Sequence, residues 1–156
     1  MLLAVDVGNS QTVAGLFSGD ELLHDWRVST IRRTTVDELA ASHDNILQLR
    51  GGSLTEVDHM VVASVVPELT VSYQALADRY LDRPAVVVGP GVRIGRDCML
   101  LGRVGLNRGV SVGEGACLGA STITEPGVQV PAGARVPFAT ILRRPRLPGD
   151  GAPQDE

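Results

Sequence analysis

From Val86 onward the sequence divides into rows of six residues: VVVGPG, VRIGRD, CMLLGR, VGLNRG, VSVGEG, ACLGAS, TITEPG, VQVPAG, ARVPFA and TILRRP. The third residue of every row is aliphatic except Thr124, and the first residue is small or β-branched throughout. A period of six cannot place one apolar face on an α-helix, whose period is about 3.6 residues. Through Leu142 the pattern instead predicts short strands separated by tight bends, wound so that each coil lies on the one before it.

The residues before Val86 predict a different architecture, in which strands and helices alternate. Apolar runs are separated there by turn-forming Gly, Asn, Ser and Asp residues. The expected elements are strands over 2–7, 12–17 and 21–29, a helix from Thr35 to Gly51, a fully buried strand over 60–66, a helix over 70–81 and a strand over 85–89. The fold class is therefore α/β in this half.

The first predicted helix carries clear start and stop signals. Thr35 and Glu38 have the spacing of a capping box, and Gly51 ends the helix. We expect Asp37 and Glu38 to act as helix-start carboxylates rather than as catalytic groups. His43 falls on the apolar face of this helix, so we expect it to be a partly buried neutral residue and not a metal ligand.

Composition excludes several classes of protein. Hydrophobic residues make up 44% of the chain but aromatic residues only 3%, so the core is aliphatic. All 14 basic residues are arginine, which excludes a Walker-type lysine and a Schiff-base lysine. The net charge of −4 and the scattered arginines predict no nucleic-acid partner. The apolar runs are too short to span a bilayer and no signal peptide is evident, which predicts a cytoplasmic protein without a membrane partner.

Five motifs of the first half, taken together, resemble a known family. They are Asp6-Val7-Gly8-Asn9-Ser10-Gln11-Thr12, Trp26 to Thr30, Arg33 to Leu39, Ala63-Ser64-Val65-Val66-Pro67, and Gly89 to Gly95. Their order is similar to that in the first lobe of the acetate and sugar kinase, heat-shock protein and actin (ASKHA, ribonuclease H-like) superfamily. More narrowly, residues 1–95 resemble a type III pantothenate kinase.

The resemblance implies ATP-dependent phosphorylation of pantothenate in coenzyme A biosynthesis, with Mg²⁺, a monovalent cation and a dimeric assembly. The implied ATP-binding residues are Asp6, Gly8, Asn9, Ser10, Gln11, Thr12 and Val13. The chemistry of the residues agrees, because Gly8 lets the backbone approach a phosphate and the hydroxyls of Ser10 and Thr12 are donors. Asp6 is the expected Mg²⁺ ligand. The alternative is a plain hairpin in which Asp6 and Asn9 bond to the turn.

Two further motifs that the resemblance implies have no counterpart in the sequence. One is a Gly-Ala-Asp-Arg stretch with the catalytic base, and the other is an Asp-Phe-Gly-Thr-like stretch of the second lobe. The nearest string, Gly95-Arg96-Asp97, lies inside the six-residue rhythm. Because phosphoryl transfer depends on positioning and charge stabilisation, we expect a weakly active or inactive kinase whose catalytic residue is unknown.

The six-residue rows resemble a short left-handed parallel β-helix of the hexapeptide-repeat transferases. That resemblance implies about three coils and a trimeric assembly. The family's acyltransferases use a histidine base, yet His24, His43 and His59 all precede the rows. Three interpretations stay open: a non-catalytic trimeric scaffold, an acyltransferase that uses Glu114 or Glu125, and a chance rhythm in Gly/Val-rich sequence from a high-GC gene, produced by a frameshift or gene truncation.

The sequence thus predicts three segments: a kinase-like ATP-binding lobe over 1–85, a β-helix over 86–142 and a disordered tail over 143–156. Cys98 and Cys117 fall inside the rows, far from any histidine, and we expect structural thiols rather than a zinc site.

Overall fold

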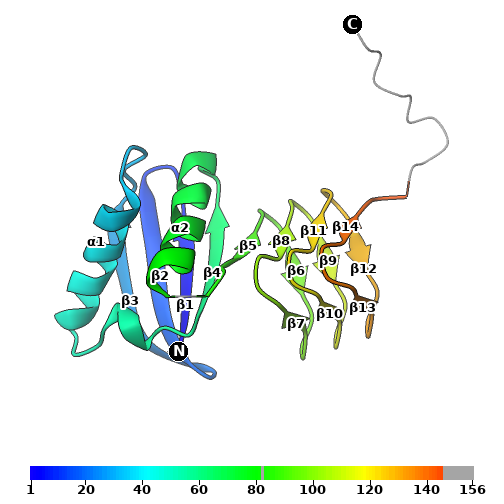
Figure 1. Cartoon of the computed structure of the whole chain (residues 1–156), viewed down its shortest axis with the longest axis horizontal. Helices are drawn as coiled ribbons and strands as arrows, with labels where there is room; N and C mark the ends of the chain where they lie inside the picture. The colour runs from blue at the N-terminus through cyan, green and yellow to red at the C-terminus, as the bar shows by residue number, and fades with distance from the viewer. Residues whose placement is uncertain (82, 146–156) are drawn as a thin grey trace, which may run out of the picture.

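The structure, a computed structural model, describes residues 1–81 and 83–145 and has two parts that share one sheet (Figure 1). The first part is an α/β lobe in which both helices lie on the same side of the sheet. Its elements are β1 (Leu2–Val7), β2 (Gln11–Ser18), β3 (Glu21–Ser29), α1 (Val36–Gln48), the 3₁₀ helix η1 (Leu54–Glu56), β4 (His59–Ser64), α2 (Pro67–Tyr80) and β5 (Val86–Val88).

The strands of the lobe follow the order β5-β4-β1-β2-β3. β1, β2 and β3 form an antiparallel meander, whereas β4 and β5 run parallel to β1. Alternate side chains of β1 point to opposite faces of the sheet. Leu3, Val5 and Val7 are buried with the helices, while Ala4 and Asp6 lie on the other face. The lobe therefore has one covered face and one open face.

Helix α1 begins and buries its apolar face as the sequence predicts. The Thr35 hydroxyl accepts from the Glu38 amide, and the Glu38 carboxylate accepts from the Thr35 amide at 2.7 Å. These bonds also hold the pKa of Glu38 below its usual range, because they favour the charged carboxylate. The helix-start role expected for Glu38 is confirmed, and His43 lies on the buried face together with Leu47.

Two expectations for the second half of the lobe were wrong in detail. The strand predicted over 60–66 ends at Ser64, and Val65 is 51% exposed. Only alternate residues of β4 are fully buried, because no helix covers the open face of the sheet. Helix α2 begins at Pro67, three residues earlier than predicted. A proline fits the first turn of a helix because the N–H groups there have no acceptor within the helix, so the absence of one costs no hydrogen bond.

The second part, which we call the coil stack, comprises residues 86–142 (Figure 1). Its strands are β6 (Arg93–Ile94), β7 (Met99–Leu100), β8 (Gly105–Leu106), β9 (Ser111–Val112), β10 (Cys117–Leu118), β11 (Ile123–Thr124), β12 (Gln129–Val130), β13 (Arg135–Val136) and β14 (Ile141–Leu142). Together with β5 they form three parallel sheets, one on each side of a three-sided coil. Ile141 lies beside Ile123, eighteen residues earlier, so each coil takes three rows of six.

The interior of the coil stack is filled by the first and third residues of most rows, although Ile94, the third residue of the second row, is exposed. Val104, Leu106, Val110 and Val112 are among the buried members of a separate apolar core. Thr124, the exception at a third position, is also buried, and its hydroxyl accepts from the amide of Asn107 at 2.9 Å. A buried polar group is tolerated when it is bonded in this way.

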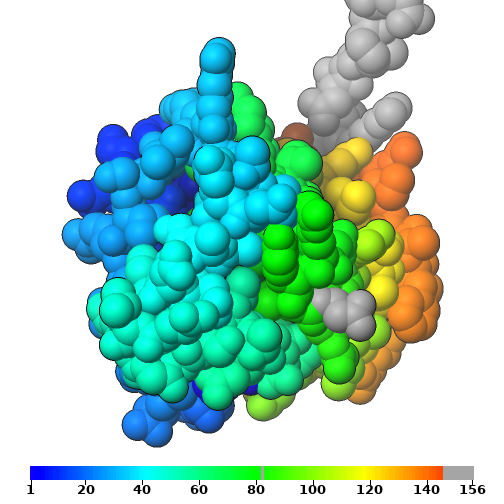
Figure 2. Space-filling view, turned by 60° about the vertical axis from the view of Figure 1, so that its left-hand side comes forward, coloured from blue at the N-terminus to red at the C-terminus, as the bar shows by residue number. Residues whose placement is uncertain are grey.

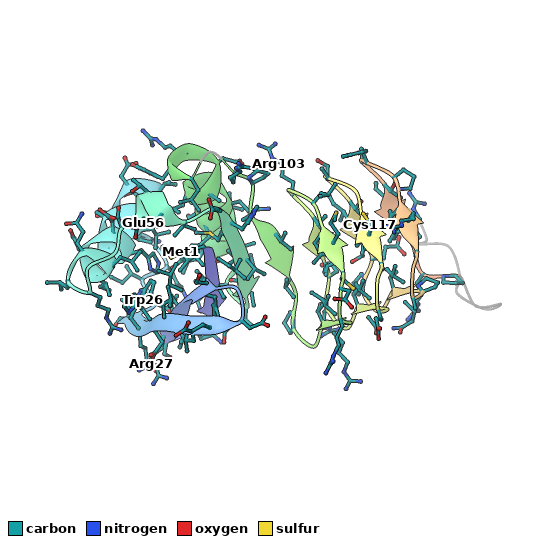
Figure 3. All side chains as sticks on the ribbon, turned by 90° about the horizontal axis from the view of Figure 1, so that it is seen from below. Met1, Trp26, Arg27, Glu56, Arg103 and Cys117 are labelled. Carbon is teal, nitrogen blue, oxygen red and sulfur yellow. The ribbon has the colours of Figure 1, made fainter. Side chains whose placement is uncertain are left out.

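Strand β5 joins the lobe to the coil stack. Val61 of β4 pairs with Val86, and Val87 pairs with Gly105 of β8, so an eight-stranded sheet runs from β3 to β14 without interruption. Arg103 of the first coil also forms an ion pair with Asp78 of α2 at 3.2 Å, and its side chain lies between the two parts (Figure 3). The boundary near residue 86 thus falls inside a continuous sheet.

Helices α1 and α2 form one broad surface of the lobe, and the coil stack continues beside it (Figure 2). None of the helices in the described ranges is long and apolar enough to cross a membrane. At the end of the coil stack, the amide of Arg144 donates to the Glu125 carboxylate at 3.1 Å. The tail predicted to be disordered covers residues 143–156, and residues 146–156 of it lie outside the described residues.

Candidate functional site

The carboxyl ends of β1, β4 and β5 meet at one edge of the sheet. Gly8 follows β1, Val65 follows β4 and Gly89 follows β5, and the Val65 amide donates to the Val7 carbonyl at 3.1 Å. In open α/β sheets this edge is the usual place for ligands. β1 is also the strand at which the sheet changes from parallel to antiparallel pairing. The loop after β1 is therefore the first place to look for a site.

The loop over residues 8–11 is a tight turn between β1 and β2. The Gly8 amide donates to the Gln11 carbonyl at 3.0 Å, and the Thr30 amide donates to the Ser10 carbonyl at 2.9 Å. A β-carbon at Gly8 would lie 2.9 Å from the Gln11 carbonyl oxygen, too close for any other residue to fit without movement. Asn9, Ser10 and Gln11 are exposed. The loop thus presents an accessible, glycine-dependent stretch of backbone.

Asp6 lies beside this loop on the open face of the sheet. It pairs with Val13 of β2 and its side chain is exposed. It is also part of a groove of about 490 Å³ whose other walls include Val13, Val61 and Val88. A single carboxylate suits Mg²⁺, which binds proteins through one or two carboxylates and keeps water or phosphate as its other ligands. Asp6 therefore fits the expected role, and the described residues contain no cluster of three or more metal-ligating side chains.

Thr12 lies on the opposite face of the sheet from Asp6, where it contacts Thr30. It is only 2% exposed, and its hydroxyl lies 3.0 Å from that of Thr30. The Thr30 hydroxyl in turn donates to the Gly8 carbonyl at 2.9 Å. The donor expected from Thr12 is thus engaged inside the protein, whereas the Ser10 hydroxyl is on the exposed side.

Beneath Thr12 lies a buried cluster of Trp26, His43 and Tyr73. The Trp26 Nε1–H donates to His43 Nδ1 at 3.0 Å, and His43 Nε2 lies 2.9 Å from the Tyr73 hydroxyl. Burial lowers the pKa of His43 to about 4 and raises that of Tyr73. The neutral state predicted for His43 agrees with this environment, although the residue is more completely buried than expected, at 1% exposure.

A cavity of about 300 Å³ opens beside this cluster on the helical side of the sheet. Thr12, His43 and Tyr73 form part of its wall, and the exposed residues Arg33 and Glu38 also line it. Thr12 of β2 thus lines this cavity, whereas Asp6 of β1 lines the groove on the other face of the sheet.

Arg32 also belongs to this region, although no sequence motif indicates it. Its guanidinium donates to the Asn9 side-chain oxygen at 3.0 Å, which places a positive charge at the exposed side of the loop. The two residues are 23 positions apart. Only the return of the chain after β3 brings them together, so no local pattern signals the contact.

The cysteines and the two glutamates singled out in the six-residue rows lie on the coil stack. Cys98 and Cys117 are free thiols, and Cys98 donates to the Gly113 carbonyl at 3.2 Å. Cys117 lies on β10, well removed from the lobe (Figure 3). Glu125 is engaged with Arg143 and the Arg144 amide, and Glu114 lies in a bend between strands.

Comparison with known proteins identifies the family to which the chain is similar. The family model for type III pantothenate kinase matches residues 2–108, which include β1, the loop and every element of the lobe. The chain belongs to the type III pantothenate kinase family. The match extends beyond residue 95, where the resemblance seen in the sequence ends, and includes the first coil and the start of the second, up to Arg108.

Individual relatives agree with the family model. The type III pantothenate kinase of Rubrobacter xylanophilus is 44% identical over 97 residues, which cover 62% of this chain and 37% of the relative. Those of Geotalea daltonii and Brevibacillus brevis are 41% and 39% identical over 95 residues, covering 61% of this chain and 37% of each relative. The chain thus spans little more than a third of the length of the curated kinases it matches.

Proposed function

We propose that the loop after β1 binds the phosphates of Mg-ATP, and that the protein is a type III pantothenate kinase-like phosphotransferase by descent. The observation that carries the proposal is the position of Asp6. Its carboxylate is exposed at the carboxyl end of β1, directly beside a loop whose turn only glycine fits at residue 8. Phosphate sites need this combination of close backbone approach and a ligand for the accompanying cation.

Each residue of the loop has a distinct role in this proposal. Asp6 holds Mg²⁺, which neutralises charge on the phosphate oxygens when it is bound. The backbone amides of Asn9 to Gln11 and the exposed Ser10 hydroxyl supply donors, Gly8 allows close approach of the backbone, and Arg32 adds a positive charge at the same side. Thr12 and Val13 anchor the start of β2, with Val13 forming part of the groove beside Asp6. None of the described contacts assigns a monovalent cation to a residue.

Pantothenate is the proposed acceptor because the matched family is defined by that substrate. The 156 residues contain neither the Gly-Ala-Asp-Arg stretch nor the Asp-Phe-Gly-Thr-like stretch that the resemblance implies. Phosphoryl transfer relies on positioning the acceptor and stabilising charge from both sides of the nucleotide. We therefore propose that these residues alone bind nucleotide weakly and transfer phosphate slowly or not at all.

A second candidate function is a scaffold built from the coil stack as a hexapeptide-repeat left-handed β-helix that trimerises. Its support is the spacing of eighteen residues between paired strands, together with exposed apolar side chains at Ile123, Phe138 and Ile141. Sedimentation velocity tests it. A trimer at micromolar concentration supports the scaffold, a dimer favours the kinase-like assembly, and a monomer contradicts both assemblies.

Isothermal titration with Mg-ATP tests the first proposal. We expect a dissociation constant near 1 mM, because only one wall of a nucleotide site is provided, and binding at this level corresponds to about −4 kcal/mol. Asp6→Asn should abolish the heat, while Asp20→Asn, in the exposed turn between β2 and β3, should leave it unchanged. Absence of heat at millimolar nucleotide, or equal heat from wild type and Asp6→Asn, contradicts the proposal.

A further inference from the structure

Thr30, the residue that follows β3, makes two hydrogen bonds to the loop after β1. Its hydroxyl donates to the Gly8 carbonyl at 2.9 Å, and its amide donates to the Ser10 carbonyl at 2.9 Å. The amide bond extends the β2–β3 pairing by one residue. The hydroxyl bond reaches across β2, the middle strand of the meander, to the residue that follows β1. One side-chain hydroxyl thus joins the ends of two strands that are not neighbours in the sheet.

The two bonds fix the orientation of the peptide groups in the loop. Residues 8–11 contain three peptide planes, and Thr30 holds the first through the Gly8 carbonyl and the third through the Ser10 carbonyl. These peptides are trans, so the C=O and N–H of each plane point in opposite directions. The Asn9 amide therefore points away from Thr30. Within the described ranges, the amides of Asn9 and Ser10 donate to no protein group, which leaves both for a ligand.

The Thr30 hydroxyl is itself held in one orientation. It has a single proton, which it gives to the Gly8 carbonyl, so in its contact with the Thr12 hydroxyl it accepts. Thr12 therefore donates to Thr30 over 3.0 Å, from a position that is only 2% exposed. A hydroxyl that accepts one bond while it donates another is a stronger donor than an isolated one.

Arg32 adds a third contact from the same segment. Its guanidinium donates to the side-chain oxygen of Asn9 at 3.0 Å. Residues 30–32 thus contact three consecutive residues of the loop, from Gly8 to Ser10. An arginine has five N–H donors, and the described contacts use one of them. The segment after β3 therefore both fixes the loop and places free donors beside it.

We infer that Thr30 is a positioning residue for the proposed phosphate site, and that it acts by holding the Gly8 and Ser10 carbonyls away from the bound phosphate. The inference rests on the proposed nucleotide binding for its effect on affinity. Thr30 contacts the carbonyl side of the loop, so it is not a phosphate ligand itself. A loop that is already ordered binds more tightly, because less order must be imposed on binding.

The first test removes the Thr30 hydroxyl and keeps the shape of the side chain. In Thr30→Val the Gly8 carbonyl is released, whereas Thr30→Ser retains the hydroxyl. The matched control is Thr140→Val in the coil stack, because Thr140 is equally half-buried and its hydroxyl donates to the Pro137 carbonyl at 2.8 Å. The measurement is the set of NMR order parameters of the loop amides, with the strand amides as the reference for an intact fold.

The inference predicts a local change. The order parameter of the Asn9 amide should be about 0.85 in wild type, Thr30→Ser and Thr140→Val, and below about 0.6 in Thr30→Val. The Gln11 amide should stay near 0.85 in all four proteins, because the Thr30 amide still holds its peptide plane. A rigid Asn9 amide in Thr30→Val would overturn the inference. Equal mobility in Thr30→Ser would also overturn it, since packing of the methyl group would then hold the loop.

The second test titrates Mg-ATP into the same samples and follows the amide shifts. Thr30→Val should bind about three- to tenfold more weakly than wild type, while Thr30→Ser and Thr140→Val should bind equally well. Arg32→Gln should also weaken binding, but with a rigid Asn9 amide, because it removes a charge and leaves the Gly8 carbonyl held. Direct contact and positioning thus give different pairs of readings.

The two measurements separate this inference from the proposed function. If wild type binds no Mg-ATP, the proposed function fails, and the order parameters still decide whether Thr30 holds the loop. If wild type binds Mg-ATP and Thr30→Val binds it equally well, the positioning role fails and the proposed function stands.

Discussion

The lobe and the coil stack differ in the side chains that form their buried cores. The lobe buries large side chains such as Tyr73 and Trp26 between a sheet and two helices, and it tolerates a buried polar cluster in that space. The coil stack buries aliphatic side chains without any aromatic ring, and its buried polar residues are threonines bonded to nearby backbone. Among the described residues, hydrogen bonds between buried aromatic and histidine side chains are found in the lobe.

The two parts nevertheless share one sheet, so mutations in one part can test whether its stability depends on the other. Because β5 pairs with both β4 and β8, loss of either core removes support from the same strand. We therefore expect the two parts to unfold together.

The largest expected effect comes from truncating one fully buried leucine in each core. Leu76→Ala in α2 and Leu118→Ala in β10 should each lower the free energy of unfolding by about 2–5 kcal/mol, because both side chains are fully buried. Urea denaturation followed by circular dichroism should show a single transition in both variants. Two separate transitions in Leu118→Ala, with the first belonging to the coil stack, would show that the lobe folds independently of it.

The second effect is a pH dependence that belongs to the lobe alone. Burial lowers the pKa of His43 from 6.5 to about 4, so between these values the unfolded chain binds a proton that the folded chain does not. Stability should therefore fall as the pH drops from about 6.5 to 4, by roughly 3 kcal/mol in total. Urea midpoints across this range, compared between wild type and His43→Gln, measure this contribution.

The matched control for this prediction is the exposed His59, since His59→Gln should keep the wild-type pH dependence. Trp26 is the only tryptophan in the sequence and bonds directly to His43, so its fluorescence reports the same protonation. A fluorescence midpoint near 6.5 in the folded protein would contradict the buried, neutral state of His43.

A third and smaller effect compares a glycine from each part. Gly8→Ala should destabilise the protein by about 1–3 kcal/mol, because its β-carbon would lie 2.9 Å from the Gln11 carbonyl oxygen. Gly105→Ala in β8 should be nearly neutral, because its β-carbon would meet only Ile123, at an ordinary 3.8 Å. Thermal melts of the two variants give the comparison, and equal costs would mean that the loop is not as tight as described.

The smallest effect concerns the ion pair at the junction. Arg103 and Asp78 lie 3.2 Å apart, but both side chains are largely exposed. Arg103→Gln should therefore cost between about 0 and 1 kcal/mol, with any effect reduced further by salt. A loss above 2 kcal/mol in a urea titration would show that side chains, rather than the shared sheet, hold the two parts together.

Much of the lobe could be predicted because its signals are local. The capping box at Thr35, the turn at Gly8 and the alternating apolar runs all act within a few residues. The start of α2 was misplaced because Pro67 was not used as a first-turn residue. The strand at β4 was predicted to be fully buried because its apolar run does not reveal that one face of the sheet lacks helices.

The candidate site was predictable only in part, for the same physical reason. Asp6 lies near the end of β1 and Gly8 directly follows that strand, so their positions depend on neighbours in the sequence. Arg32, by contrast, reaches Asn9 across 23 residues, and the hydrogen bonds from Trp26 through His43 to Tyr73 need β3, α1 and α2 to meet. His43 was expected on a buried face, but its partners could not be assigned before the packing of α1 against α2 was known.

The most direct test of the account is to map Mg-ATP onto the two parts of the protein by NMR chemical shifts of backbone amides. The account predicts shifts concentrated at residues 6–13 and around Arg32, with the amides of the coil stack beyond Arg108 unchanged. Shifts confined to the coil stack, or none at millimolar Mg-ATP, would contradict the claim that the loop after β1 is the nucleotide site.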